Sequence, residues 1–282
     1  MSTTSLSQRV AVVTGGNKGI GFEIVRKLCN QFDGIVYLTA RDDDRGRSAC
    51  VQLEQEGVVK PPKFHQLDIT DEASIARFRD YTQRQYKGLD VLVNNAGIAY
   101  NVKSTVAYAE QTENTIKVNF TAILNVCKAL FPLIRTHGRV VHVSSGAGVL
   151  SRVPSQVLRN EFSRADLEES ELVKMVAQFV EDTKAGNYAD KGWPTDLPYV
   201  VSKLALNVLT CIQARENKYE KSRDVLINCC CPGSCRTDMA GGEGPKSAEE
   251  GAETPVYLAL LPPGLEQPHG KYVREKKEES WK

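Results

Sequence analysis

Short apolar, β-branched runs recur along the chain and alternate with stretches long enough to form helices. Each run is bounded by polar residues or glycine, which is typical of strands buried on both faces of a sheet. The predicted strands cover residues 10–13, 35–39, 63–67, 91–93, 139–143 and 225–230. Amphipathic patterns between them predict helices, for example at 73–86 and 113–134.

Strands that alternate with helices favour a parallel sheet, because each return to the sheet needs a right-handed crossover through a helix. No repeat, low-complexity tract or Pro/Gly-rich linker divides the 282 residues. The sequence therefore predicts one α/β domain over residues 1–282. Its expected form is a doubly wound, Rossmann-type domain with a mainly parallel sheet flanked by helices.

Two segments depart from this alternation. Residues 150–198 are too long for an unstructured loop in a compact domain, and their apolar positions follow helical spacing up to Gly186: Leu172, Val176, Phe179 and Val180. A helical insert is predicted there. Later, Ser247 and Glu250 have the spacing of a capping box for a helix that ends near Pro262. The charged tail at 274–282 is expected to be solvated and frayed.

Charge and hydropathy narrow the classes of function. The chain has 36 Lys and Arg against 35 Asp and Glu, a formal charge of +1, so no basic excess favours nucleic acid or an anionic membrane. No window approaches about 18 uninterrupted apolar residues, and residues 1–8 lack an apolar signal core. We therefore expect a cytoplasmic protein with no membrane span.

The eight cysteines lack the spacing of a disulfide framework. Cys229, Cys230 and Cys231 fall in a predicted strand, where successive side chains alternate faces, so they cannot share one tetrahedral zinc ion. None of the four histidines pairs with a cysteine at a ligand spacing. Free thiols and no metal site are expected.

A glycine-rich turn follows the first predicted strand directly, with the sequence Thr14-Gly15-Gly16-Asn17-Lys18-Gly19-Ile20-Gly21. Glycine permits positive φ and a close approach to a pyrophosphate, and the next helix offers free N–H groups to phosphates. The turn predicts a dinucleotide site, and Asn94-Asn95-Ala96-Gly97 follows the fourth predicted strand at the same edge. The alternative is a tight strand–helix connection and an ordinary turn.

The end of the second predicted strand bears on which dinucleotide binds. An acidic residue there would hold a ribose 2′-hydroxyl, but Arg41 occupies this position and Lys18 lies in the glycine turn. Two cations suit a 2′-phosphate, which favours NADPH and NADP. The alternative is two solvated cations, with Asp42 holding the ribose of NAD.

Tyr199 and Lys203 are four residues apart in a predicted helix, so their side chains share one face. A nearby ammonium is expected to lower the pKa of the phenol from its usual value of about 10, which would make it a usable acid. Ser145 follows the fifth predicted strand, and Asn119 lies within a helix. Each of these residues also has an ordinary structural interpretation: a surface pair, a turn hydroxyl or a buried amide.

Taken in this order, these motifs resemble the short-chain dehydrogenase/reductase family over almost the whole chain. The insert at 150–198, the run 247–263 and two shorter runs are similar to the monomeric NADPH-dependent carbonyl reductases. The shorter runs are Arg236-Thr237-Asp238-Met239-Ala240 and Pro268-His269-Gly270. The resemblance implies reduction of aldehydes, ketones or quinones to alcohols with NADPH.

The resemblance also implies roles for single residues. Tyr199 would donate the proton, and Ser145 would hold the carbonyl oxygen. Lys203 would bind the nicotinamide ribose and tune Tyr199, while Asn119 would support a water relay. The implied cofactor contacts are Gly15, Asn17, Lys18, Gly19, Ile20, Gly21, Arg41, Asp68, Ile69, Asn95, Tyr199, Lys203, Pro232, Cys235, Arg236 and Thr237.

One departure bears on the substrate, for which Ser145, Tyr199 and Ser234 are the expected contacts. Ser234 stands where such reductases usually carry a bulky aromatic of the pocket, which leaves the substrate preference open. The resemblance further implies a glutathione site near 100–102 and Gln111. Alternatives are a narrower dehydrogenase of steroids, prostaglandins or pteridines and a non-catalytic NADP(H)-binding regulator or scaffold.

Assembly is a further expectation. Many relatives associate through the helix that bears the catalytic Tyr and Lys, and the apolar face of the insert at 150–198 must be buried against something. If it covers that helix, it blocks a second copy, so we expect a monomer. The alternative is an insert that packs elsewhere as a substrate lid.

Overall fold

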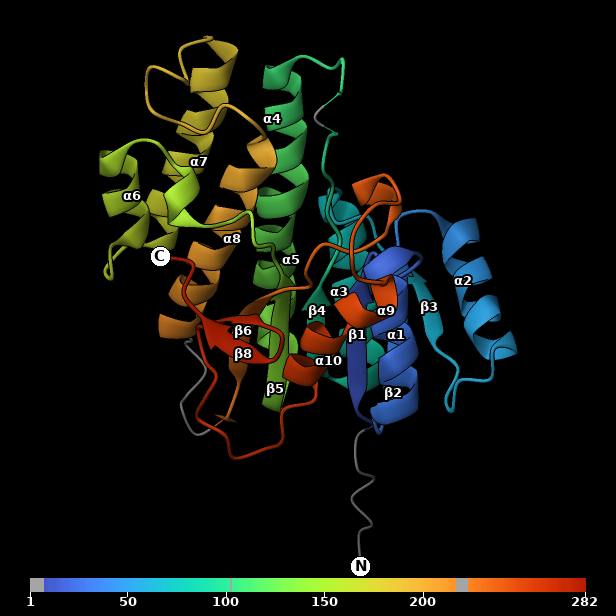
Figure 1. Ribbon diagram of the computed structural model, residues 1–282. Coiled ribbons are helices and arrows are strands. Elements are labelled where there is room, and N and C mark those ends of the chain that lie inside the picture. Colours follow the sequence, from blue (N-terminus) through green and yellow to red (C-terminus); the bar gives the residue numbers. More distant parts are fainter. Residues whose placement is uncertain (1–7, 102, 217–222) are drawn as a thin grey trace, which may run out of the picture.

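A computed structural model describes residues 8–101, 103–216 and 223–282 (Figure 1). In these residues one sheet has the strand order β3-β2-β1-β4-β5-β6-β7-β8, parallel throughout except for the last pair. The strands are β1 (Val10–Thr14), β2 (Ile35–Ala40), β3 (Lys63–Gln66), β4 (Leu89–Asn94), β5 (Ile134–Val143), β6 (Leu226–Cys231), β7 (Tyr272–Arg274) and β8 (Lys277–Glu279). This order confirms the predicted doubly wound, Rossmann-type class.

The central strands are buried on both faces, which explains their continuous apolar runs. Core residues on one face come from helices α1 (Gly19–Gln31), α2 (Asp43–Gln55) and α10 (Glu253–Ala259), and the short helix α9 (Ala248–Gly251) packs against α1. Core residues on the other face come from α3 (Glu72–Tyr86), α4 (Tyr108–Ile116), α5 (Ile123–Leu130) and α8 (Pro198–Arg215). Helices on both faces are visible in Figure 1.

The helix expected at 113–134 is interrupted. A π-helical segment, Lys117–Ala122, separates α4 from α5, and a 3₁₀ turn follows at Phe131–Leu133. By length and composition the whole run, Tyr108–Leu133, could cross a membrane. Its most apolar window of 18 residues has a mean hydropathy of 1.3. In the structure this run packs against α3, α8 and the later helix α7 (Glu169–Lys184), and half of its most apolar window is buried.

The predicted helical insert is present as α6 (Gln156–Ser163) and α7 (Glu169–Lys184). Leu172, Val176 and Phe179 are fully buried, because α7 packs against α4 and α8. The helix ends just before Gly186, whose φ is +74°.

The predicted capping box is confirmed, since Ser247 and Glu250 bond reciprocally at the start of α9. The expectation of a frayed tail is wrong. β7 pairs with β6, and β8 pairs with β7. Trp281 is only 6% exposed, and its carbonyl accepts a hydrogen bond of 2.9 Å from the Leu150 amide. Sheet pairing and one large apolar side chain hold the charged tail in place.

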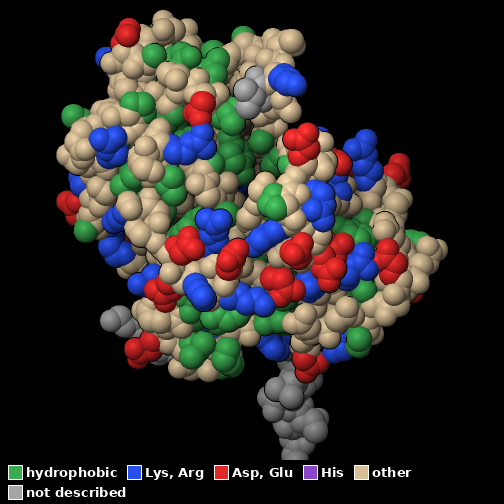
Figure 2. Space-filling model, viewed as in Figure 1, with side chains coloured by type: hydrophobic (Ala, Val, Ile, Leu, Met, Phe, Trp, Pro, Cys, Tyr) green, Lys and Arg blue, Asp and Glu red, His purple; other side chains and the backbone are tan. Residues whose placement is uncertain are grey.

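Positive and negative side chains are intermixed on the face that Figure 2 shows. Among the ion pairs of the described residues, Glu253 on α10 contacts both Lys27 on α1, at 2.6 Å, and Lys276 in the β7–β8 turn, at 2.7 Å. The two cations share one carboxylate, so the C-terminal hairpin is tied to α1 through α10.

The cysteines of β6 alternate as predicted. Cys230 lies in the apolar core with α1 and α10, whereas Cys229 and Cys231 lie in the core with α8. All eight cysteines are free thiols.

Candidate active site

The predicted motifs meet at the edge where the parallel strands end (Figure 1). The glycine turn joins β1 to α1, Asn95 follows β4, Ser145 follows β5 and Pro232 follows β6. Helix α8 packs against β6 and the π-helical segment, and it brings Tyr199 and Lys203 to the same edge. Ligands of open α/β sheets bind at this edge.

The glycine turn has the shape of a phosphate cradle. Gly15 and Gly19 have φ values of +64° and +56°, in the left-handed region that favours glycine. A Cβ on Gly21 would lie 2.3 Å from the Gly15 carbonyl oxygen and 2.4 Å from Asn95 Nδ2. No side chain caps the N-terminus of α1, so its first N–H groups are left for a ligand. The residues present therefore fit a dinucleotide.

Hydrogen bonds of Thr14 and Asn95 join the glycine turn to the segment that follows β4. Thr14 Oγ1 accepts hydrogen bonds from the amides of Asn95 at 3.0 Å and Ala96 at 3.1 Å. Asn95 Nδ2 donates to the carbonyls of Thr14 at 3.0 Å and Gly15 at 3.1 Å. Sequence reasoning missed the role of Thr14, although its place at the head of the glycine motif could have indicated it.

Lys203 is almost fully enclosed. It is 4% exposed, and its ammonium donates a 2.8 Å hydrogen bond to the carbonyl of Val143, the last residue of β5. Its Nζ also lies 5.5 Å from the centroid of the Tyr199 ring. Tyr199 in turn hydrogen bonds with the side chain of Ser145. The structure thus brings these three predicted residues together.

Burial sets the protonation of this group. It raises the pKa of Tyr199 to about 12, while the hydrogen bond with Ser145 acts in the opposite direction. Burial also lowers the pKa of Lys203 to about 8. The expectation of a lowered pKa for Tyr199 is therefore wrong for the protein alone, because desolvation outweighs the hydrogen bond with Ser145. At neutral pH the phenol keeps its proton and the lysine keeps its charge.

Asn119 is fully buried in the π-helical segment. Its Oδ1 accepts from the Ile98 amide at 2.8 Å, and its Nδ2 donates to the Ile98 carbonyl at 2.8 Å and to Ser202 Oγ at 3.2 Å. The side chain therefore joins the loop after β4 to α8, next to Lys203. π-Helical turns often occur at functional sites.

The two cations expected to contact the cofactor, Arg41 and Lys18, both lie at this edge of the sheet. Arg41 follows β2 and is exposed. Lys18 is also exposed and forms a 2.8 Å ion pair with Asp238, a partner that sequence reasoning missed. The carboxylate of Asp42 accepts the Arg45 amide as the N-cap of α2, so it is already engaged.

The segment after β6 lies against the glycine turn. A Cβ on Gly19 would be 3.4 Å from Thr237 Cγ2, which places Thr237 beside the cradle. Cys235 is buried and its thiol faces the Pro232 carbonyl at 3.4 Å. The guanidinium of Arg236 instead donates to the carbonyls of its own loop, and Ser234 is exposed.

The residues expected to bind glutathione make contacts between α4 and the loop that precedes it. Gln111 is buried and its Nε2 donates to the Val106 carbonyl at 2.7 Å, while the Tyr100 hydroxyl accepts from Asn114 at 3.0 Å. Val102 lies outside the described residues.

Comparison with known proteins settles the family. The sequence profile described as short chain dehydrogenase matches residues 9–157. The chain belongs to the short-chain dehydrogenase family. This confirms the resemblance drawn from the motifs.

Relatives within the short-chain dehydrogenase family match nearly the whole chain. Carbonyl reductase (NADPH) 1 of Mus musculus is 50% identical over 279 residues, which cover 98% of this chain and 100% of that protein. The protein of the same name from Homo sapiens is 52% identical over 274 residues, 96% of this chain and 98% of that protein.

Among solved structures, salutaridine reductase from Papaver somniferum superposes with a TM-score of 0.84 at 32% identity. The match covers 94% of this chain and 99% of that one. Menthone neomenthol reductase from Mentha piperita gives 0.82 at 31% identity, covering 96% and 100%.

Proposed function

We propose that this protein reduces carbonyl compounds (aldehydes, ketones or quinones) to alcohols with NADPH, as expected from the sequence. The observation that carries the proposal is the enclosed Tyr199–Lys203 pair, with Ser145 beside it at the edge of the glycine cradle. The names of the relatives from mouse and human, carbonyl reductase (NADPH) 1, support the same reaction and the same cofactor.

NADPH, when bound, supplies the hydride. The Ser145 hydroxyl orients the carbonyl oxygen of the substrate, and the Tyr199 hydroxyl donates its proton to that oxygen as negative charge develops there. Lys203, held by the Val143 carbonyl, stabilises the phenolate that Tyr199 becomes. Asn119 is assigned to a water relay behind Lys203, and its bonds to Ile98 and Ser202 fix its side chain there.

The glycine turn, from Gly15 through Asn17, Gly19 and Ile20 to Gly21, is assigned to the pyrophosphate. Arg41 and Lys18 are assigned to the 2′-phosphate, with Asp68 and Ile69 beside the adenine. The ribose and nicotinamide end is assigned to Asn95, Pro232, Cys235 and Thr237. Arg236 would contribute there through its backbone, since its side chain donates to carbonyls of its own loop. The engaged carboxylate of Asp42 supports NADPH over NADH. We do not extend the proposal to glutathione, because the amide group of Gln111 already donates to a carbonyl just before α4.

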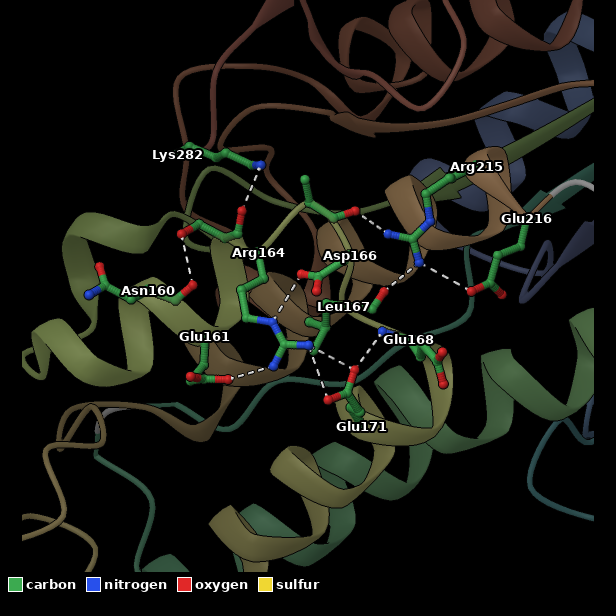
Figure 3. Close-up of polar contacts among 12 residues, drawn as sticks. Asn160, Glu161, Arg164, Asp166, Leu167, Glu168, Glu171, Arg215, Glu216 and Lys282 are labelled. Carbon is green, nitrogen blue, oxygen red and sulfur yellow. Dashed lines mark hydrogen bonds and ion pairs between the residues drawn. The ribbon is translucent and has the colours of Figure 1, made fainter.

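We also propose a monomer, folded as a single domain. α7 of the insert packs on α8, the helix through which a second copy would associate. Figure 3 shows polar contacts that hold the α6–α7 connection of the insert: Arg164 points to the carboxylates of Glu161, Asp166 and Glu171. Arg215, the last residue of α8, donates to the carbonyls of Ala165 and Leu167.

A cytoplasmic location is proposed as well. The eight free thiols support a reducing compartment, because paired cysteines are typical of oxidising ones.

Tyr199→Phe tests the reaction. We expect NADPH-dependent loss of a carbonyl substrate, taken from a panel of aldehydes, ketones and quinones, to fall by about 10²–10⁴-fold, since the variant has no proton to donate. NADPH affinity should change little. Tyr257→Phe, at an exposed tyrosine of α10, is the matched control. More than about a tenth of the wild-type activity in Tyr199→Phe would exclude this residue as the proton donor.

The pH profile tests Lys203. Its lowered pKa means that the positive charge is lost as the pH rises through about 8, so kcat/KM should fall above that pH. In Lys203→Arg the guanidinium stays charged, and the decline of whatever activity remains should move to higher pH. A wild-type profile that stays flat to about pH 10 would contradict a catalytic role for the charged lysine.

Lys18→Gln combined with Arg41→Gln tests cofactor choice. Two charged hydrogen bonds at about 1.5 kcal/mol each, the low end for such exposed groups, predict a loss of NADPH preference over NADH of about a hundredfold. Asp238→Asn should act in the opposite direction by freeing Lys18. Lys191→Gln, at an exposed cation of the insert, is the control. An unchanged preference ratio in the double variant would refute the assignment.

Light scattering at micromolar concentration tests the assembly. A mass near 31.1 kDa is expected, because α7 occupies the face of α8. A mass of twice that value would show that the insert leaves an interface free.

A further inference from the structure

A chain of side-chain hydrogen bonds crosses the edge of the sheet between β2 and β3. The last paired residues of these strands are Ala40 and Gln66. Gln66 Nε2 donates to the Arg41 carbonyl at 3.1 Å, and Gln66 Oε1 accepts from Ser74 Oγ at 3.0 Å. Ser74 Oγ in turn accepts from the Asp68 amide at 3.0 Å. We call Gln66 and Ser74 the adenosine-side relay.

The direction of every bond in the adenosine-side relay is fixed. The Arg41 carbonyl can only accept, so the amide nitrogen of Gln66 must face it and the amide oxygen must face Ser74. The Asp68 amide can only donate, so the Ser74 hydroxyl accepts from it and donates to Gln66. Each group in the relay thereby has a partner of the right kind, and a turned amide would set two acceptors against each other.

The relay joins two segments that are otherwise only loosely connected. On one side, Asp68 Oδ1 accepts from Thr70 at 2.8 and 2.7 Å, so the turn after β3 is held within itself. Ser74 is fully buried in the first turn of α3, which anchors that side of the relay. Beyond the ends of the strands, one backbone bond, from Leu67 to Ala40 at 2.9 Å, also spans the gap.

We propose that Gln66 and Ser74 are positioning residues for the adenosine half of the cofactor, an inference that rests on the proposed function. Arg41 is assigned to the 2′-phosphate, and Asp68 with Ile69 is assigned to the adenine. An adenosine 2′-phosphate must contact both segments at once. The relay sets their spacing before binding, so that binding does not have to order them.

Gln66→Met removes both polar atoms of the relay at an unchanged side-chain length, and Gln66 is only half-buried, which favours folding. We expect the Kd of adenosine 2′,5′-bisphosphate to rise about five- to tenfold, as typical for the loss of one to two hydrogen bonds. The Kd of nicotinamide mononucleotide should not change. KM for NADPH should rise by the same factor while kcat stays constant.

Ser74→Ala should give the same pattern. Because both residues act in one relay, the double variant should be little worse than the poorer single variant. The matched control is Gln52→Met on α2, where an exposed glutamine loses a bond to Glu56, the residue that follows the helix. Calorimetry with the two fragments measures all four variants.

Three results would overturn the proposal. Bisphosphate affinities within about twofold of the control in both single variants would show that the relay positions nothing. Equal weakening of both fragments, together with a lower Tm, would show a merely structural role. A wild-type protein that binds 5′-AMP as tightly as the bisphosphate would overturn the proposed cofactor itself. If the wild-type protein prefers the bisphosphate to 5′-AMP but the variants bind the bisphosphate with unaltered affinity, only the role of the relay is overturned.

Discussion

The hydrogen bond from the Lys203 ammonium to the Val143 carbonyl is the contact on which the site depends. It fixes a charged group at the end of β5, in a place where burial lowers its pKa to about 8. The same enclosure raises the pKa of Tyr199 to about 12. Desolvation therefore keeps the phenol protonated and makes the nearby charge effective, because electrostatic interactions strengthen where water is excluded.

This contact requires α8 to lie across the end of the sheet, and the rest of the fold holds it there. α8 is buried along nearly its whole length, with β6 on one side and α4 and α7 on others. Asn119 ties it to the loop after β4 through Ser202. The insert and Trp281 cover the remaining surface, and Arg215 fastens the α6–α7 connection to the helix end. The segments that distinguish this chain from a bare doubly wound sheet thus enclose the helix that carries Tyr199 and Lys203.

The sequence predicted the features that follow from periodicity and from local spacing. Strands β1, β2, β4 and β6 are buried along their whole length and have mainly apolar sequences. Tyr199 and Lys203 share a face because four residues make about one helical turn. β7 and β8 were missed, since Tyr272–Arg274 and Lys277–Glu279 are short and mostly charged, without alternation. Their order comes from pairing with β6 and from Trp281, which are tertiary effects.

Errors at the site have a similar origin. The direction of the Tyr199 pKa shift depends on enclosure by distant segments, which a spacing of four residues does not reveal. The π-helical segment around Asn119 has no signal in the amphipathic pattern. The side chain of Arg236 donates to a carbonyl of its own loop, and that of Gln111 donates to a carbonyl just before α4. Only the folded chain brings these backbone carbonyls near the two side chains.

The central claim is that enclosure, rather than a lowered phenol pKa, prepares Tyr199 as a proton donor. The most direct test is a carbon-13 NMR titration of protein labelled at tyrosine Cζ, with the Tyr199 signal assigned by its loss in Tyr199→Phe. The structure predicts a signal that stays in the phenol position up to at least about pH 10, because desolvation raises the pKa of this half-buried phenol. A Tyr199 signal that titrates between about pH 7 and 8 would contradict this account.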